Sequence, residues 1–396
     1  MLGFLGRFVI PAFQASLTYY LWRRLVHDTA LRGRARTIAT VAMIVLMLSV
    51  PLTIMAMRLG AGWISAYGAW VAFPWLGLAA LCTILFVARD LVRLARFGVR
   101  KAMKPPEVPD DPQRRQFLAR VTAGAIGTAA VGAGAVGAKV ALGEHRVTTV
   151  EVPIATLPPA LDGFTLAQIS DLHIGMTIGT SFVSDVVDAT NAIGADVIVL
   201  TGDIVDGPVD YVADRAAPLA RLRAPYGVFA VTGNHEYYSN ADAWIPVLER
   251  LGLVFLRNER VEMTRAGAAF DLVGIDDFTA KGHPGHGADL AGALAGRDPS
   301  RATVLLAHQP RQVHDAVAHG IDLQLSGHTH GGQIWPWHYA ARLQQGGFLS
   351  GLERVDRTWL WTSRGVGYWG PPVRLGAPPE IVKIVLRAGT GEPKIS

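Results

Sequence analysis

The sequence predicts a protein in two parts, an N-terminal membrane region of apolar helices and a C-terminal domain of the α/β or α+β class. Three observations lead to this prediction. Long apolar stretches precede residue 100, short β-branched segments alternate with helical segments after Val147, and the net charge changes sign between the two parts. With 396 residues, the chain has room for two or three domains.

The composition supports a membrane protein. Half of the residues are hydrophobic, 17% are charged and the mean hydropathy is +0.28, which is unusual for a soluble chain and excludes a disordered, collagen-like or disulfide-built one. Residues 1–142 hold 17 Lys and Arg against 5 Asp and Glu, a net charge of +12, which leaves 20 against 27, a net charge of −7, for the rest. The basic character therefore belongs to the membrane part, and we expect no nucleic-acid partner. Cys82, the single cysteine, cannot form an intrachain disulfide.

Three apolar stretches, roughly residues 4–22, 38–57 and 64–87, precede residue 100. Each approaches or exceeds the about 20 helical residues that cross a hydrocarbon core of about 30 Å. The second and third contain no ionisable residue and are expected to span the membrane. Arg7 interrupts the first, which either spans or lies on the membrane as an interfacial helix. Residues 1–100 are therefore predicted to form a membrane region with two to three transmembrane helices.

Residues 101–120 are predicted to be a basic cytoplasmic linker, followed by a signal-like segment or fourth transmembrane helix at residues 121–142. Arg114 and Arg115 precede Phe117, Leu118 and a weakly hydrophobic run, which resembles a twin-arginine export signal. The alternative is a plain fourth spanning helix with basic residues at its cytoplasmic end. Both interpretations place the domain at residues 143–396 on the same side of the membrane.

The distribution of positive charge predicts the orientation. Five arginines follow the first stretch and eight Lys or Arg follow the third, whereas only Arg58 lies between the second and third. Because basic loops stay cytoplasmic, a fourth crossing delivers the C-terminal domain to the outer face. We expect a multi-pass protein of a bacterial inner or cell membrane with this domain extracytoplasmic. Its expected partners include membrane lipids and the twin-arginine translocation machinery.

Polar residues of the kind that bind metals follow five of six candidate strands. The strands are expected at residues 164–170, 197–201, 228–232, 270–275, 303–307 and 323–326. A rigid sheet can aim the side chains that follow its strands at a single point. The candidate site residues are Asp171, His173, Asp203, Asn234, His235, Glu236, His308, His328 and His330.

The residue types indicate a centre for more than one metal ion. Residues two apart in extended chain point the same way, so Asp171 and His173 can share one ion, as can His328 and His330. A mixed nitrogen and oxygen ligand set suits Zn, Mn or Fe rather than Ca, and the absence of Cys ligands argues against a closed structural zinc site. There are too many ligands for one tetrahedral ion, whereas two ions bridged by a shared carboxylate would use them all.

In this order, the blocks Asp-x-His, Gly-Asp, Gly-Asn-His-Glu, a lone His and Gly-His-Thr-His resemble the calcineurin-like metallophosphoesterase superfamily, over about residues 145–390. Residues 307–310, 327–333 and 365–381 further resemble its membrane-associated branch with twin-arginine-type signals. The resemblance implies two mixed sheets packed together with helices outside, and a metal-dependent phosphoesterase with two divalent or trivalent ions, Mn, Fe or Zn. By the resemblance, one ion is held by Asp171, His173, Asp203 and His330, and the other by Asp203, Asn234, His308 and His328.

The resemblance also implies a mechanism. A hydroxide between the two ions attacks phosphorus, while His235 contacts the phosphate and protonates the leaving oxygen. Glu236 is assigned as the partner that fixes the imidazole.

Together these observations predict a membrane-anchored phosphohydrolase that acts on a phosphoester or pyrophosphate, a phosphorylated small molecule or a lipid-linked substrate. Two alternatives remain. One is a cytoplasm-facing nucleotide-sugar-lipid pyrophosphatase, and the other is a non-catalytic membrane sensor or transport accessory.

Some chemically suggestive residues stay outside the predicted site. His283 and His286 occupy a turn-rich loop and are left unassigned, and His314 and His319 are expected on a helix surface. Five tryptophans gather late in the chain and either belong to the core or lie against lipid beside the active site, namely Trp335, Trp337, Trp359, Trp361 and Trp369.

Overall fold

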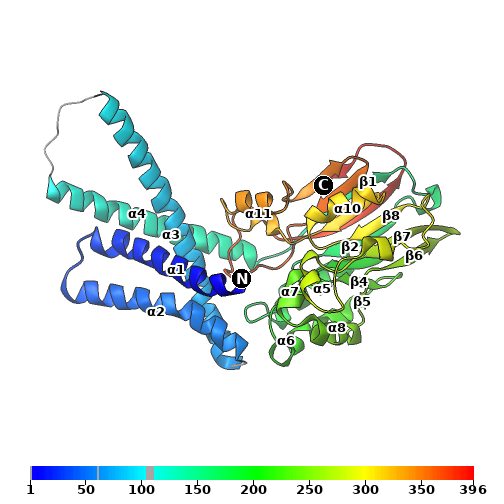
Figure 1. The fold of residues 1–396 in the computed structure, drawn as a ribbon, viewed down its shortest axis with the longest axis horizontal. Coiled ribbons are helices and arrows are strands. Elements are labelled where there is room, and N and C mark those ends of the chain that lie inside the picture. Colours follow the sequence, from blue (N-terminus) through cyan, green and yellow to red (C-terminus); the bar gives the residue numbers. More distant parts are fainter. Residues whose placement is uncertain (1, 60–61, 104–110) are drawn as a thin grey trace. The chain divides into compact units, whose positions relative to one another are not determined.

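The computed structural model describes residues 2–59, 62–103 and 111–396, and the chain divides into two compact units. The helical unit comprises residues 1–139 with Gly370–Val373, and the catalytic unit comprises Val140–Trp369 with Arg374–Ser396. Long helices make up the first and two β-sheets dominate the second (Figure 1).

The helical unit contains the helices α1 (Leu2–Trp22), α2 (Gly33–Arg58), α3 (Gly62–Met103) and α4 (Pro112–Ala141). Within the described residues, three helices are long and apolar enough to cross a membrane: Gly33–Met57, Gly62–Met103 and Pro112–Ala141. The structure thus contains the second and third predicted stretches as helices, and α1 is not among the three. Near the end of α1, Tyr20 donates a hydrogen bond of 2.8 Å to Asp90 of α3, which also pairs with Arg24 and Arg89.

Helix α4 begins earlier than the sequence analysis expects, at Pro112 instead of residue 121. The carboxylate of Asp111 accepts the backbone N–H groups of Gln113 and Arg114 at 2.9 and 3.2 Å, and Pro112 suits the first helical position. Arg114 and Arg115 therefore lie in the first turn of α4 rather than in an extended linker. Residues 104–110 of the predicted linker lie outside the described residues.

The catalytic unit is built on two mixed β-sheets. The first has seven strands in the order β13-β1-β12-β2-β3-β4-β5. These are β1 (Arg146–Ile154), β2 (Thr165–Ile169), β3 (Val197–Thr201), β4 (Val228–Val231), β5 (Val254–Phe255), β12 (Glu380–Ala388) and β13 (Lys394–Ile395). Strands β2 to β5 run parallel, whereas β12 is antiparallel to β2.

The second sheet has six strands in the order β10-β11-β9-β8-β7-β6. These are β6 (Glu259–Arg265), β7 (Ala268–Gly274), β8 (Thr303–Leu306), β9 (Leu323–Ser326), β10 (Gly351–Val355) and β11 (Thr358–Thr362). The four central strands are parallel and the two edge pairs are antiparallel.

The two sheets share one apolar core. Leu166 and Val199 of the first sheet and Leu272, Val304 and Leu325 of the second belong to a single buried cluster. Because side chains alternate along a strand, Val273 and Leu305 point to the opposite face of the second sheet. There they pack with buried residues of α9 (Leu290–Ala293) and α10 (Val313–Ala318). The predicted architecture of two packed mixed sheets flanked by helices is confirmed.

Four further helices complete this unit (Figure 1). They are α5 (Thr180–Ala192), α6 (Val209–Ala216), α8 (Ala241–Arg250) and the seven-residue α11 (His338–Gln344). A short helix, α7 (Asn234–Tyr238), starts three residues after β4. It carries a run of predicted site residues.

Candidate metal centre

The predicted ligand side chains follow strands of both sheets. Asp171 and His173 come after β2, Asp203 after β3 and Asn234 after β4, while His308 follows β8 and the pair His328 and His330 follows β9. Since the strands within each group are parallel neighbours, their carboxyl ends lie at one edge of each sheet. The two edges together bring all nine candidate residues into one region, and six of them are at most 5% exposed.

The backbone that presents these side chains is strained. Five of the residues have left-handed φ angles: Asp171 (55°), His173 (50°), Asp203 (52°), His328 (71°) and His330 (50°). For a residue with a Cβ this conformation costs about 1–2 kcal/mol and needs support from its surroundings. The N–H of Asp171 donates to the Gly202 carbonyl at 3.1 Å, and that of His173 donates to the Asp203 carbonyl at 3.0 Å. Such strain gathered at one place indicates a functional site.

Glycine is required where loops approach closely. A Cβ on Gly233 would collide with the Asp203 carboxylate, and one on Gly327 would collide with Ser170 and Asp171. These contacts explain why glycines stand in the Gly-Asn-His-Glu and Gly-His-Thr-His segments.

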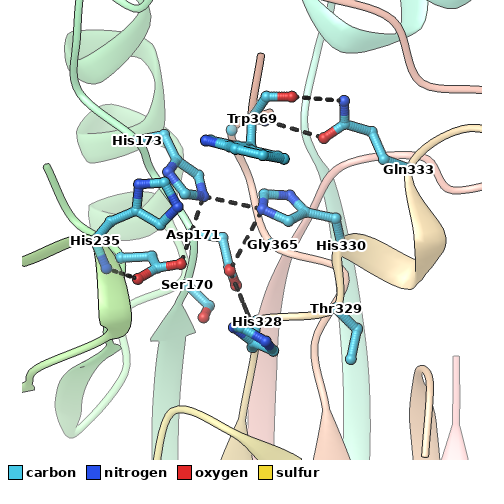
Figure 2. A network of polar contacts seen from close by, with 12 residues as sticks. Ser170, Asp171, His173, His235, His328, Thr329, His330, Gln333, Gly365 and Trp369 are labelled. Atoms are coloured by element: carbon cyan, nitrogen blue, oxygen red, sulfur yellow. Dashed lines mark hydrogen bonds and ion pairs between the residues drawn. The ribbon is translucent and has the colours of Figure 1, made fainter. Parts of the chain in front are cut away.

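One group of potential ligands consists of Asp171, His173 and His330. The Nε2 atoms of the two imidazoles lie 2.9 Å apart, and the His330 Nε2 lies 3.6 Å from Asp171 Oδ1. Figure 2 shows the two rings side by side and the Asp171 carboxylate between His330 and His328. That carboxylate also accepts the backbone N–H of His328 at 3.0 Å, which fixes its orientation.

A second group consists of Asp203, His308 and His328. His308 Nε2 lies 3.1 Å from Asp203 Oδ2 and 3.2 Å from His328 Nδ1. The other ring nitrogen of His308, Nδ1, lies 2.7 Å from the Thr201 carbonyl and donates to it, so Nε2 is the nitrogen that faces the group. Asp203 Oδ2 also lies 3.7 Å from His173 Nε2, so this carboxylate lies between the two groups.

The donor set fits metal ions. Within the part of the chain that the structure describes, the buried Oδ1 atom of Asn234 and Nδ1 atom of His173 have no hydrogen-bond partner. Unpaired buried polar atoms are costly, and an ion is one way to satisfy the carboxamide oxygen. The structure places the seven predicted ligands together, and their division between two ions remains a prediction.

Burial and neighbouring charges shift the pKa values of the candidate ligands in different directions. Burial lowers the pKa of His173 and of His328 to about 3, so both imidazoles are neutral at neutral pH. Burial alone would raise the pKa of Asp203, but the neighbouring His308 and His235 hold it well below its usual range. Neutral His173 and His328 and an ionised Asp203 are in the forms that bind divalent cations. Burial would lower the pKa of His308, but Asp203 raises it well above its usual range, so an ion that binds this imidazole must displace a proton.

His235 lies beside the two ligand groups and is a member of neither. Its Nδ1 faces Asp206 Oδ1 at 3.3 Å, and its ring meets the His173 ring edge-on at 4.5 Å. Burial would lower its pKa, but Asp203 and Asp206 raise it to about 9. A third potential ligand group does include it, together with His173 and Asp203. The role of His235 in proton transfer remains a prediction.

The hydrogen bonds of Glu236 differ from the imidazole contact that the sequence analysis expects. Its carboxylate instead accepts four backbone N–H groups at 2.6 to 3.1 Å, those of Asp203, Ile204, Val205 and Gly233. Because Glu236 lies in α7 and its carboxylate binds the loop after β3, it joins the two segments that carry Asn234 and Asp203. The carboxylate that faces the His235 ring is Asp206, three residues beyond Asp203, and this proximity in sequence was the available signal.

Sequence reasoning also missed Arg374, whose side chain is fully buried. Its guanidinium donates to the carbonyls of Gly367 (2.8 Å), Ala377 (3.0 Å) and Arg364 (2.9 Å), and one NH2 group lies 3.1 Å from His330 Nδ1. Burial lowers its pKa to about 10, so it remains charged at neutral pH. Arg374 therefore joins the last loop of the catalytic unit to a candidate ligand.

The four histidines that the sequence analysis leaves outside the site are arranged as ordinary polar side chains. His283 is exposed, with its ring tilted against that of Tyr237, whereas His286 contacts Asp242 at 2.9 Å and Arg257 at 2.7 Å. His314 is exposed on α10, and His319 follows its end. Within the described residues, none of the four belongs to a potential metal-binding group.

Comparison with known proteins identifies the family. The family described as calcineurin-like phosphoesterase matches residues 164–332. A metallophosphoesterase of Bacillus subtilis, YkuE, is 31% identical over 284 residues, which cover 69% of this chain and 98% of the relative. The chain therefore belongs to the calcineurin-like metallophosphoesterases. Its candidate ligands agree with the metal ions that this family implies.

A bovine protein named "Transmembrane protein with metallophosphoesterase domain" is 40% identical over 254 residues, 61% of this chain and 57% of the relative. The match thus spans little more than half of that protein. Among solved structures, a dimetal phosphatase from Danio rerio has 15% identity and a TM-score of 0.39, covering 59% of this chain and 98% of that one.

Proposed function

We propose that the protein is a membrane-anchored phosphohydrolase that uses two metal ions to cleave a phosphoester or pyrophosphate of a lipid-linked substrate outside the cytoplasm. The observation that carries this proposal is the position of Asp203, whose Oδ2 atom lies 3.1 Å from His308 and 3.7 Å from His173. One carboxylate between two sets of imidazoles suits a pair of ions better than one ion. Asp171, His173 and His330 would hold one ion, and Asn234, His308 and His328 the other.

The surrounding residues support different roles for the metal ions, Glu236 and His235. When bound, the ions would neutralise phosphoryl charge and make water a better nucleophile. The Glu236 carboxylate holds the loop of Asp203, and the Asp206 carboxylate lies 3.3 Å from His235 Nδ1. This leaves His235 Nε2 to donate a proton to the leaving oxygen, which general acid catalysis requires.

A lipid-linked substrate is supported by the helical unit. Three helices long and apolar enough to span a membrane precede the catalytic unit, and a relative is named a transmembrane protein. Such helices would confine the enzyme to a membrane surface, where phosphate groups of lipids are concentrated.

The test is a substrate screen with the purified full chain. After loading with Mn, Fe or Zn, it should hydrolyse both bis(p-nitrophenyl) phosphate and a lipid phosphate or diphosphate in mixed micelles. Activity on the soluble ester alone would contradict the lipid assignment. Failure on both substrates, with metal bound, would favour a sensor or transport accessory.

The orientation is tested separately. We expect a reporter that is active only outside the cytoplasm to be active when fused after Ser396, and added protease to digest the catalytic unit in spheroplasts. The basic residues before α4 support this expectation. A silent reporter and a protected domain would favour the cytoplasm-facing lipid-precursor pyrophosphatase instead.

The export route has its own test. If Arg114 and Arg115 form a twin-arginine signal, replacing both with Lys should keep the domain inside the cell. If α4 is an ordinary spanning helix, export should continue, because the positive charge is unchanged.

A further inference from the structure

Five large side chains of the catalytic unit are exposed in two neighbouring segments. They are Trp335 (59% exposed), Trp337 (66%), Tyr339 (66%), Leu343 (84%) and Trp369 (57%), here called the aromatic platform. The first four lie on α11 or just before it, and no residue of α11 is buried. By contrast, Trp361 belongs to the core and Trp359 is half-buried against it. The late tryptophans therefore divide between the core and the surface.

Hydrogen bonds join the two segments of the aromatic platform. The side chain of Gln333 donates to the carbonyl of Trp369 and accepts its N–H, both at 3.0 Å (Figure 2). The N–H of Trp335 donates to the Leu375 carbonyl at 3.2 Å, and the N–H of Leu375 donates to the Gln333 carbonyl at 2.8 Å. The exposed rings are thus carried by one connected structure rather than by separate loose loops.

The platform borders the metal centre. The ring of Trp369 lies 5.8 Å from the ring of His235, and Figure 2 shows it across the His173 and His330 rings. Gln333 follows His330 by three residues. A surface that binds the aromatic platform therefore lies next to the candidate site.

The chemistry of the platform suits a lipid surface. Removing apolar surface from water stabilises a protein by about 25 cal/mol per Å² of buried area. Patches of exposed apolar side chains therefore often mark interaction surfaces. Trp and Tyr carry an apolar ring with a polar tip, which is why they gather at membrane interfaces. Helix α11 contains no acidic residue and exposes Arg342, which suits anionic headgroups.

Chain length provides an independent reason. Four residues, 142–145, separate the end of α4 at Ala141 from the start of β1 at Arg146. An extended chain spans at most about 3.5 Å per residue, so such a link reaches only about 15 to 20 Å from the end of α4. If α4 spans the membrane, the bilayer is the surface that the catalytic unit meets first.

We propose that the aromatic platform inserts its rings into the headgroup region of the bilayer and holds the metal centre at the level of lipid phosphates. The inference rests on the membrane anchoring in the proposed function and adds a residue-level contact surface to it. Its occupant is the bilayer that contains the chain's own helices.

Depth measurements on the full chain test the proposal directly. In a Cys82→Ser background, Trp337→Cys and Leu343→Cys each carry one environment-sensitive fluorophore, and the chain is reconstituted in vesicles of phosphatidylcholine and phosphatidylglycerol. Lipids with a quencher near the headgroup should lower the fluorescence at both positions about twofold. The matched control is Val254→Cys, an exposed position on β5 (48%), whose label should not respond. Unquenched labels at both platform positions would overturn the proposal, whether or not they crosslink to a second copy.

An activity ratio provides the second readout. Leu343→Asp should lower hydrolysis of a lipid phosphate in vesicles by roughly tenfold relative to hydrolysis of bis(p-nitrophenyl) phosphate, because it removes one inserted apolar side chain. An unchanged ratio, with the lipid phosphate hydrolysed, would contradict the platform. If the chain hydrolyses no lipid phosphate, the lipid part of the proposed function fails, while quenching of the labels would still support the platform.

Discussion

The helical unit and the catalytic unit have opposite arrangements of polarity. The helices expose large apolar side chains, such as Ile38 (68%) and Trp63 (73%), whereas the catalytic unit buries Asp171, Asp203 and Glu236 at 2% exposure or less. In water alone both arrangements are unfavourable, since exposed apolar surface and buried charge each cost free energy. Both arrangements agree with the proposed function, in which lipid surrounds the helices and cations occupy the centre.

The two units therefore depend on their sequences in different ways. In the helices a property of many residues, mean hydropathy over a span, determines the environment, so most single substitutions should be tolerated. In the catalytic unit the identity of a few residues at strand ends determines it. Substitutions should therefore act very unequally there, and the predictions below follow that inequality from the largest effect to the smallest.

The largest effect is expected for Asp203→Ala. Because Asp203 lies between the two ligand groups, its loss should release both ions and reduce turnover to background. Elemental analysis and hydrolysis of bis(p-nitrophenyl) phosphate would measure this, and membrane insertion of the helices should not change. The matched control is Asp210→Ala, an exposed acidic residue on α6, which should retain both metals. A metal-replete Asp203→Ala protein would show that the carboxylate bridges nothing.

His235→Ala should separate chemistry from metal content. If His235 donates a proton and holds no ion, turnover should fall by about 10² to 10⁴ while the metal content stays at that of the parent protein. The measurement pairs steady-state kinetics with elemental analysis of the same preparation. Loss of metal in this variant would instead place His235 among the ligands, as its proximity to His173 and Asp203 would allow.

Those two variants change residues that the sequence identifies. The sequence also predicts the positions of strands, since the expected strands at residues 197–201 and 323–326 match β3 and β9. Both are short, buried apolar runs followed by glycine, and such runs depend on local pattern alone. The ligands could be found because they directly follow strands, where the fold leaves little freedom.

Other features depend on contacts between distant segments and had no local pattern. Arg374 meets His330 across 44 residues, from a Pro- and Gly-rich loop without periodicity. The role of Glu236 depends on how the loop after β3 turns toward α7. The early start of α4, by contrast, has a local sequence pattern. Asp111 followed by Pro112 is typical of a helix start, and a prediction based only on hydropathy does not use it.

Arg374→Lys tests one of these distant contacts. Lysine keeps the positive charge but cannot serve several carbonyls and His330 at once, so His330 should be held less firmly. We expect metal affinity to fall about 10- to 100-fold, the usual range for a residue that positions a ligand. Titration of the apo protein with Mn²⁺ measures this affinity, and thermal unfolding without metal shows whether the fold itself has weakened. An affinity equal to that of the parent would limit Arg374 to holding the loop together.

The smallest effect is expected for His283→Ala. This variant compares an exposed histidine with the buried histidines of the candidate metal centre. His283 lies in the same unit as the ligands, yet its side chain is exposed and its ring contacts the rings of Tyr237 and His286. Removing it breaks no ligand group and buries no unpaired atom. The free energy of unfolding should change by less than about 0.5 kcal/mol, as for other surface substitutions. Metal content and turnover should likewise match the parent. A loss of metal comparable with that of Asp203→Ala would mean that the loop holding His283 and His286 closes over the centre, and burial in this structure would then be a poor guide to the ligands.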